Sequence, residues 1–168
     1  MGYGIIGIQK QNVELIIMGV IELKKMTDPY LKLKHIFERT LHLIDTYKPD
    51  ELAIESPFLG KNPQSMHKLG RAQGAAIAAC LQRELSITEY APLKIKQSIT
   101  GNGMAKKDTV AKMLQNVLHF EKIPDDLDAT DGLAAAMCHF YQNKISTSNK
   151  GTSSWKSFIN NNSNRLKG

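Results

Sequence analysis

The chain has few of the features that would place it among secreted, zinc-thiolate or membrane-spanning proteins. Its 168 residues include two cysteines, Cys80 and Cys138, in apolar stretches without a CxxC spacing. We therefore expect buried free thiols in a reducing cytoplasm. The five histidines show no metal-ligand spacing, no apolar run approaches the length of a membrane span, and the first residues lack a secretory pattern. These absences favour a soluble, cytoplasmic globular protein without a membrane partner.

Acidic residues are missing from the end of the chain. The segment 144–168 carries five Lys and Arg and no Asp or Glu, which leaves +1 of the formal net charge of +6 for residues 1–143. The basic balance therefore belongs mainly to a tail rich in Ser, Asn and Lys, which is either simply solvated or bound to a polyanion. The sequence predicts one domain over 1–143, followed by a basic, disordered tail over 144–168.

The pattern of apolar residues predicts an α/β order of elements. Two β-branched stretches joined by polar residues predict a hairpin, whose second half is one bent strand or two strands around Gly19. The expected strands are 2–8, 13–23, 51–57 and 86–90, and the expected helices run from Asp28-Pro29 to before Pro49, over 62–84, from Lys106-Lys107 to about His119, and from 127 onward. This order favours a mixed sheet with an antiparallel start and a parallel continuation, flanked by helices.

Carboxylates occur at two places where a catalytic cleft could form. Asp128 and Asp131 are three residues apart at the start of an otherwise apolar helix, so they share a face, about 5–6 Å apart at Cβ. Two like charges held there either complement the helix dipole or bind a cation. Glu55 ends a short buried strand just before a Ser-Pro pair, where an α/β sheet presents functional groups, unless it is an ordinary solvated glutamate. This third carboxylate favours a cation site.

The helix expected over 62–84 has a stripe of small residues. Gly70, Gly74 and Ala78 recur every four residues, although glycine costs about 1 kcal/mol relative to alanine inside a helix. Two helical glycines indicate a close approach of another backbone. That backbone belongs either to the protein's own sheet or to the same helix of a second copy.

Several motifs, taken in order, resemble the RuvC-type Holliday junction resolvases, which are crossover junction endodeoxyribonucleases of the ribonuclease H-like fold. The resemblance covers about residues 2–141. It is carried by Gly2-Tyr3-Gly4, Leu52-Ala53-Ile54-Glu55, Phe58 with Lys61-Asn62, Lys68-Leu69-Gly70-Arg71-Ala72-Gln73-Gly74, Lys96-Gln97 and Asp128-Ala129-Thr130-Asp131-Gly132-Leu133-Ala134. It implies a ribonuclease H-like fold and an enzyme that nicks two opposed strands of a four-way DNA junction in recombination and repair.

The resemblance also implies a metal site and a dimer. Glu55, Asp128 and Asp131 match three of the four acidic residues that hold two Mg²⁺ ions in the family, with Mn²⁺ as an alternative. The stripe Gly70, Gly74 and Ala78 matches the helix through which the family forms homodimers. A two-fold dimer suits a substrate of two-fold symmetry.

DNA contacts are implied at five further positions. Phe58 matches an aromatic residue that stacks on bases near the crossover, and Lys96 and Lys107 match lysines close to the reacting phosphates. Arg71 and Lys106 are additional candidates along the DNA backbone. A branch-migration helicase complex is the implied protein partner.

One part of the family's pattern is not found. The family begins with a strand that ends in Asp-Pro-Gly and supplies the first catalytic aspartate, whereas this sequence starts at Met1-Gly2-Tyr3-Gly4, just after the place of that motif. We expect Met1 to be an internal methionine of a longer protein. The alternative is a genuine short form that binds junction DNA without cleaving it.

Overall fold

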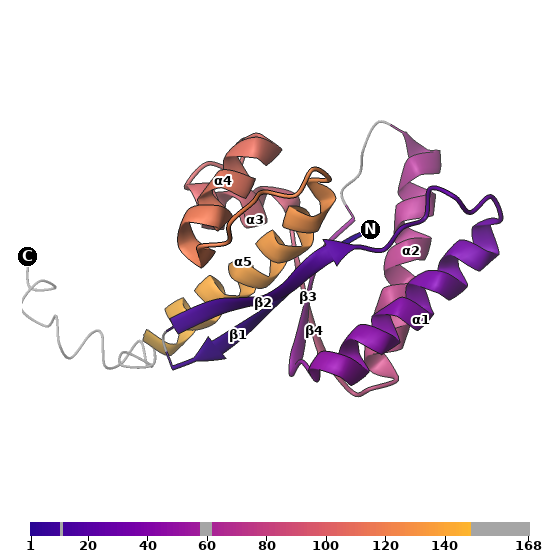
Figure 1. The fold of residues 1–168 in the computed structure, drawn as a ribbon, viewed down its shortest axis with the longest axis horizontal. Helices are drawn as coiled ribbons and strands as arrows, with labels where there is room; N and C mark the ends of the chain where they lie inside the picture. Colours follow the sequence, from indigo (N-terminus) through magenta and orange to yellow (C-terminus); the bar gives the residue numbers. More distant parts are fainter. Residues whose placement is uncertain (11, 58–61, 149–168) are drawn as a thin grey trace, which may run out of the picture.

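The computed structural model describes residues 1–10, 12–57 and 62–148, with side chains described up to residue 144. Figure 1 shows one helix pair, α1 and α2, on one side, α3 and α4 on the other, and the strands with α5 between them. The elements are β1 (Gly2–Gln9), β2 (Asn12–Val20), α1 (Pro29–Tyr47), β3 (Glu51–Glu55), α2 (Pro63–Leu81), β4 (Ser86–Tyr90), α3 (Pro92–Thr100), α4 (Lys107–Leu118) and α5 (Asp128–Ser148). The expected α/β class, antiparallel at its start and parallel afterwards, is confirmed.

The first two strands form the predicted hairpin. They pair antiparallel from Gly2 opposite Val20 to Gln9 opposite Asn12, with an irregularity between Ile5 and Ile6. The second strand is therefore one strand that continues through Gly19. It ends at Val20 and not at Leu23, because the partner strand β1 begins at Gly2, opposite Val20. Beyond this pair, Ile21 still exchanges backbone hydrogen bonds with Met1.

The parallel pair is connected through α2. Strands β3 and β4 run in register from Glu51 opposite Ser86 to Glu55 opposite Tyr90. Parallel strands need such a helical connection, which covers one face of the pair. Within the described residues, no ladder joins β3 and β4 to β1 and β2, so the strands form two separate two-stranded sheets.

Proline and Asx residues start two of the helices as the sequence predicts. The Asp28 carboxylate accepts hydrogen bonds from the backbone N–H groups of Tyr30 and Leu31, at 2.7 and 2.9 Å, with Pro29 in the first turn. Asn62 caps α2 in the same way. These side chains satisfy N–H groups that lack partners within the helix.

Helix α3 is an element that the sequence did not predict, and α5 is longer than expected. The segment 92–100 is helical, with Pro92 in its first turn and with Ile95 and the partly buried Ile99 packed on the core from one face. Helix α5 continues to Ser148, past the domain boundary expected at 143. The remainder of the expected tail, 149–168, lies outside the described residues.

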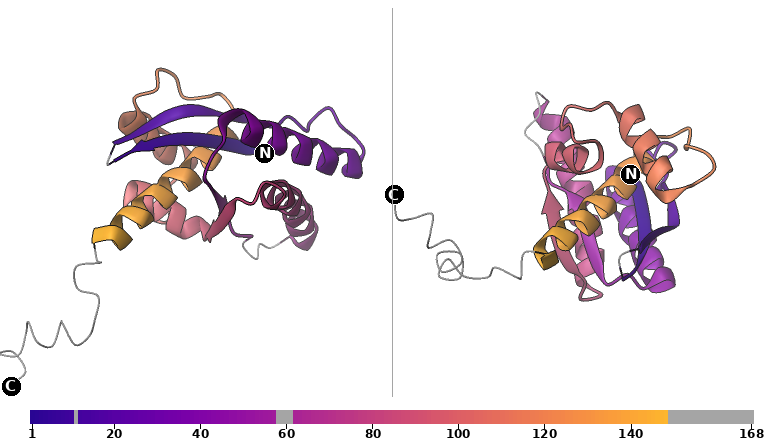
Figure 2. Two further views of the ribbon diagram at one scale, coloured as in Figure 1. Left: turned by 90° about the horizontal axis from the view of Figure 1, so that it is seen from below. Right: turned by 90° about the vertical axis from the view of Figure 1, so that its left-hand side faces the viewer.

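Helix α5 forms the centre of the main core. Leu133, Met137 and Cys138 are completely buried and pack with Leu114 of α4 and Ile95 of α3. The two views of Figure 2 show α5 crossing between the hairpin and the parallel pair, and it contacts both sheets. The two cysteines are buried and free, as predicted. A helix long and apolar enough to cross a membrane is not found in the described part of the chain.

Glycines allow α5 to lie directly on the backbone of β1. A Cβ atom placed on Gly132 would lie 2.5 Å from the Cα of Tyr3, and one placed on Gly4 would lie 2.6 Å from the Cα of Leu133. Any side chain at either position would therefore push strand and helix apart. This close contact fixes the first turn of α5, where Asp128 and Asp131 lie.

Candidate active site

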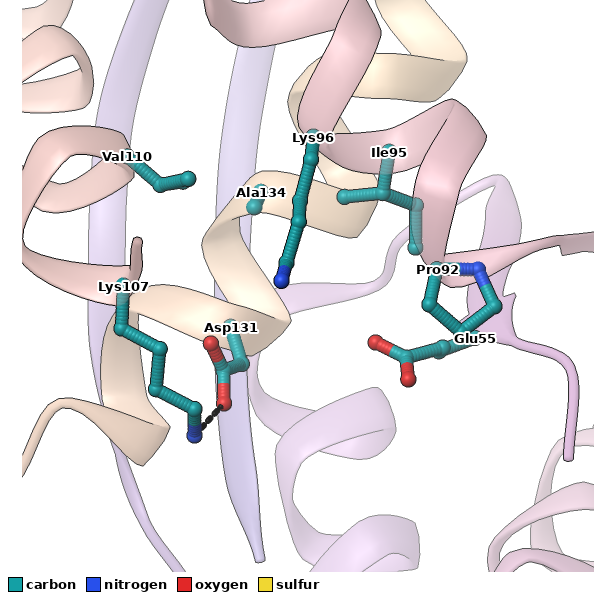
Figure 3. Close-up of a pocket in the computed structure, with 8 residues that line it drawn as sticks. All are labelled: Glu55, Pro92, Ile95, Lys96, Lys107, Val110, Asp131 and Ala134. Atoms are coloured by element: carbon teal, nitrogen blue, oxygen red, sulfur yellow. Dashed lines mark hydrogen bonds and ion pairs between the residues drawn. The ribbon is translucent and has the colours of Figure 1, made fainter. Parts of the chain in front are cut away.

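A pocket lies where the end of β3 faces the start of α5. Figure 3 shows Glu55 on one side of it and Asp131 on the other, with Lys96 of α3 extending its ammonium group between them. Its lining consists of Glu55, Pro92, Ile95, Lys96, Lys107, Val110, Asp131 and Ala134. Two acids and two lysines from four different elements thus line one pocket, and the rest of its lining is apolar.

Lys107 of α4 holds the two aspartates of α5 together. Its ammonium group lies 3.2 Å from Oδ1 of Asp128 and donates a 2.5 Å hydrogen bond to Oδ2 of Asp131. Burial lowers the pKa of Lys107, but its hydrogen bonds to these carboxylates and their charges outweigh that effect, so this pKa lies above the usual range. The predicted sharing of one face by the two aspartates is confirmed, since both carboxylates reach one cation.

The charge of Glu55 is disfavoured by its surroundings. Burial raises the pKa of Glu55, the negative charge of Asp131 raises it further, and Lys107 and Lys96 act in the opposite direction. The net effect is a raised pKa, although part of the side chain still reaches solvent. A further positive charge in the pocket, beyond those of Lys96 and Lys107, would relieve this repulsion.

Replacing Glu55 by Gln should stabilise the folded chain at neutral pH. Because the pKa of Glu55 is raised on folding, the folded state binds this proton more tightly, and stability falls as pH rises from the ordinary pKa through the raised one. We expect Glu55→Gln to raise the unfolding temperature at pH 7 by about 1–2 °C, a small gain because solvent screens the group. The gain should vanish below about pH 4, where wild-type Glu55 is protonated in both states.

The matched control for this measurement is Glu89→Gln, which alters an exposed glutamate of β4. It should show no pH-dependent gain in thermal unfolding followed by circular dichroism. An equal gain for both variants, or a gain for Glu55→Gln that persists at pH 4, would contradict the explanation.

The donor atoms fit a hard divalent cation in part. All three candidate ligands are carboxylates, which suit Mg²⁺ and Mn²⁺, and the ammonium of Lys107 shows that Asp128 and Asp131 converge on one positive charge. Across residues 1–10, 12–57 and 62–148, however, no three His, Cys, Asp or Glu side chains are close enough to hold one ion. Glu55 and Asp131 share the pocket, whereas Asp128 is not part of its lining.

The other predicted residues lie at different distances from the pocket. Lys96 and Lys107 line it, and Lys106 is exposed as the residue before the first turn of α4. Arg71 is exposed on α2 and is not part of the pocket lining. Phe58 lies outside the described residues, so its role stays a prediction.

The small-residue stripe of α2 faces away from the protein's own sheet. A Cβ atom placed on Gly70 or Gly74 would meet no atom of the described residues within 4 Å, and Ala78 is exposed. The buried face of α2 is formed instead by Gln73, Ala76, Ala79 and Cys80. Of the two interpretations of the stripe, packing on the protein's own sheet is therefore wrong.

Three polar contacts along β3 and β4 were not anticipated from the sequence. Gln73 of α2 donates a 2.6 Å hydrogen bond to the backbone carbonyl of Glu55. The ring of His139 on α5 forms hydrogen bonds with Tyr90 and Glu51. A usable signal existed for Gln73, because a polar residue in phase with Ala76 and Cys80 lies on the buried face of a helix.

Comparison with known proteins agrees with this geometry. The family model for crossover junction endodeoxyribonuclease RuvC matches residues 1–139. A relative with that name from Bacteroides fragilis is 59% identical over 99% of this chain and 90% of its own length. This chain belongs to the RuvC family. Another family member, from Porphyromonas gingivalis, is 52% identical over 99% of this chain and 91% of its own length.

Solved RuvC structures share the fold. Thermus thermophilus RuvC in complex with a Holliday junction substrate superposes with a TM-score of 0.79 at 24% identity, covering 87% of this chain and 89% of that one. A second T. thermophilus RuvC structure gives a TM-score of 0.75 at 25% identity, covering 85% of this chain and 89% of that one. The expected fold class and family are both confirmed.

Proposed function

We propose that this RuvC family member is a structure-selective endonuclease that resolves four-way DNA junctions by paired nicks during recombination and repair. The observation that carries the proposal is the pocket in which Glu55 and Asp131 face each other with Lys96 and Lys107 beside them. Acids supply ligands and proton acceptors, and lysines attract a phosphodiester. Family membership supports the same reaction.

In this proposal the side chains divide the work between metal binding and phosphate binding. Glu55, Asp128 and Asp131 would hold two Mg²⁺ ions, or Mn²⁺, with a further carboxylate that the family supplies from its first strand. Such ions, when bound, activate water and stabilise the charge on the leaving oxygen. Lys96 projects into the pocket, where its ammonium can donate a hydrogen bond to a phosphate oxygen, and Lys107 neutralises the aspartates.

DNA binding would extend from the pocket over neighbouring exposed positions. Lys106 and Arg71 are exposed and would contact the DNA backbone, and Phe58 would stack on bases near the crossover. A branch-migration helicase complex is the proposed partner, and chromosomal DNA as the substrate implies action in the cytoplasm.

We also propose a homodimer that forms through the exposed stripe of α2. The open space beside Gly70 and Gly74 and the exposure of Ala78 support this choice, because glycines in mid-helix gain little unless another backbone comes close. Sedimentation equilibrium should give twice the chain mass, and a Gly74→Arg variant should sediment as a monomer with an unchanged circular dichroism spectrum.

The deciding experiment compares a four-way junction with a linear duplex of the same sequence. The protein as its source cells make it, with any residues that precede Met1, is incubated with each DNA in Mg²⁺, in Mn²⁺ and in chelator, and nicks are mapped on labelled strands. We expect symmetric nicks in the junction, none in the duplex and none in chelator. Junction binding without nicks under any metal would favour the non-cleaving alternative. If neither binding nor nicking prefers the junction over the duplex, the endonuclease proposal and the non-cleaving alternative are both overturned.

A further inference from the structure

The C-terminal end of β3 is held from two sides. On the side of β4, the backbone N–H of Ser56 donates a 2.9 Å hydrogen bond to the carbonyl of Tyr90. On the side of α2, Nε2 of Gln73 donates its 2.6 Å bond to the carbonyl of Glu55. The peptide group between Glu55 and Ser56 is therefore fixed at both its oxygen and its N–H.

Gln73 is buried to a degree that is unusual for its residue type. It is 8% exposed and, with Thr130, one of two buried polar residues among those described. Its Oε1 atom is buried without a hydrogen-bond partner in the described structure. Burying an amide acceptor in this state costs stability, and the hydrogen bond from Nε2 to the Glu55 carbonyl offsets that cost only in part.

We infer that Gln73 is a positioning residue that fixes the end of β3 and so aims the Glu55 carboxylate at Asp131. The orientation of a side chain follows from the backbone dihedrals at its own Cα, and a bond to the Glu55 carbonyl restrains ψ of that residue. Glu55 is exposed, and its carboxylate faces the like charge of Asp131 across the pocket, so a restraint on its backbone favours this orientation over others in solvent. Gln73 acts from α2, outside the pocket lining.

Helix α2 thereby connects two proposed parts of the molecule. Gln73 lies directly before Gly74, so neighbouring residues of α2 point in different directions: Gly74 outward on the small-residue stripe and Gln73 inward to Glu55. A displacement of α2 by a partner would therefore reach the Glu55 carbonyl through one side chain. The role as an acid-positioning residue rests on the proposed function, whereas the anchoring of β3 does not.

The test uses Gln73→Met, which keeps the length of the side chain and removes the donor. The matched control is Gln82→Met, at an exposed glutamine that follows α2. Amide hydrogen exchange of Ser56, read by NMR, should become about tenfold faster in Gln73→Met and stay unchanged in Gln82→Met. The unfolding temperature should change little, because the loss of one bond is offset by removal of an unpartnered buried acceptor.

A second readout addresses the acid itself. Binding of Mn²⁺, followed by calorimetry, should weaken about tenfold in Gln73→Met while the Kd for a four-way junction in chelator stays the same. Unchanged Ser56 exchange in Gln73→Met, or equal effects in both variants, would overturn the inference. If wild-type protein binds neither Mn²⁺ nor junction, the proposed function fails, and Ser56 exchange still decides the anchoring role. Should Gln73→Met not fold, Gln73→Leu gives the same comparison.

Discussion

Asp131→Asn should lower the rate of junction nicking by at least ~100-fold and leave junction binding intact. Asp131 faces Glu55 across the pocket and accepts the short hydrogen bond from Lys107. The amide keeps the shape of the side chain but loses the charge needed to hold a divalent cation. Because this change removes negative charge from a surface proposed to bind DNA, the junction Kd should stay within about threefold of wild type or become tighter.

The measurement is single-turnover nicking of a labelled junction at saturating protein, beside a gel-shift titration in chelator. Asp125→Asn is the matched control, because Asp125 is an exposed aspartate just before the same helix and pairs with Lys122. It should nick at the wild-type rate. Nicking by Asp131→Asn at more than about a tenth of the wild-type rate would remove Asp131 from the proposed metal site.

Gly132→Ala should destabilise the fold by about 2 kcal/mol or more. The added methyl group would lie 2.5 Å from the Cα of Tyr3 and 2.8 Å from its N and C atoms. These are backbone atoms, so relief requires a shift of β1 against α5. Overpacking against backbone atoms at this distance should cost about 3 kcal/mol or more, the upper part of the usual range, and the better helix propensity of alanine offsets about 1 kcal/mol, which leaves about 2 kcal/mol or more. The unfolding temperature should fall by about 4–8 °C.

Gly74→Ala should have the opposite effect on stability, although Gly74 also lies in a helix. A Cβ atom there would meet no atom of the described residues within 4 Å. At a protein concentration low enough to keep the chain monomeric, this variant should gain up to about 1 kcal/mol in chemical unfolding. If both variants lose stability, or if Gly132→Ala loses none, close packing on β1 does not determine the change in the free energy of unfolding.

Local signals were sufficient to predict most elements of the fold. The pairs Asp28-Pro29 and Asn62-Pro63 place a side-chain cap and a preset φ at adjacent positions, and both start helices where expected. Helix α3 has weaker signals. Pro92 presets φ in its first turn and Gly101 ends it in the left-handed conformation, but Ala91 offers no capping side chain and nine residues give only a short apolar period. This helix is therefore harder to predict from the sequence than α1 or α2.

In the candidate site too, contacts between residues close in sequence could be predicted, whereas contacts between residues far apart in sequence could not. Asp128 and Asp131 could be paired from the sequence because they are three positions apart on a helix and so share one face. The ion pairs of Lys107 with these acids join positions 21 and 24 residues apart, and the bond from Gln73 to Glu55 joins positions 18 apart. Such contacts depend on how helices pack on the sheets, which no local spacing encodes.

Helix α5 packs between two sheets that, among the described residues, are not hydrogen-bonded to each other. The distance between the Asp131 and Glu55 carboxylates therefore depends on the size of the side chains buried between the helix and the strand. Asp131 is carried by α5 and Glu55 by β3, and no ladder joins the two sheets in the described part of the chain. Buried Ala134, which lines the pocket from α5, helps to set how closely helix and strand approach. A larger side chain there would widen the gap between the two carboxylates, so the small residue that follows Asp131 by one helical turn keeps these two proposed metal ligands in one pocket.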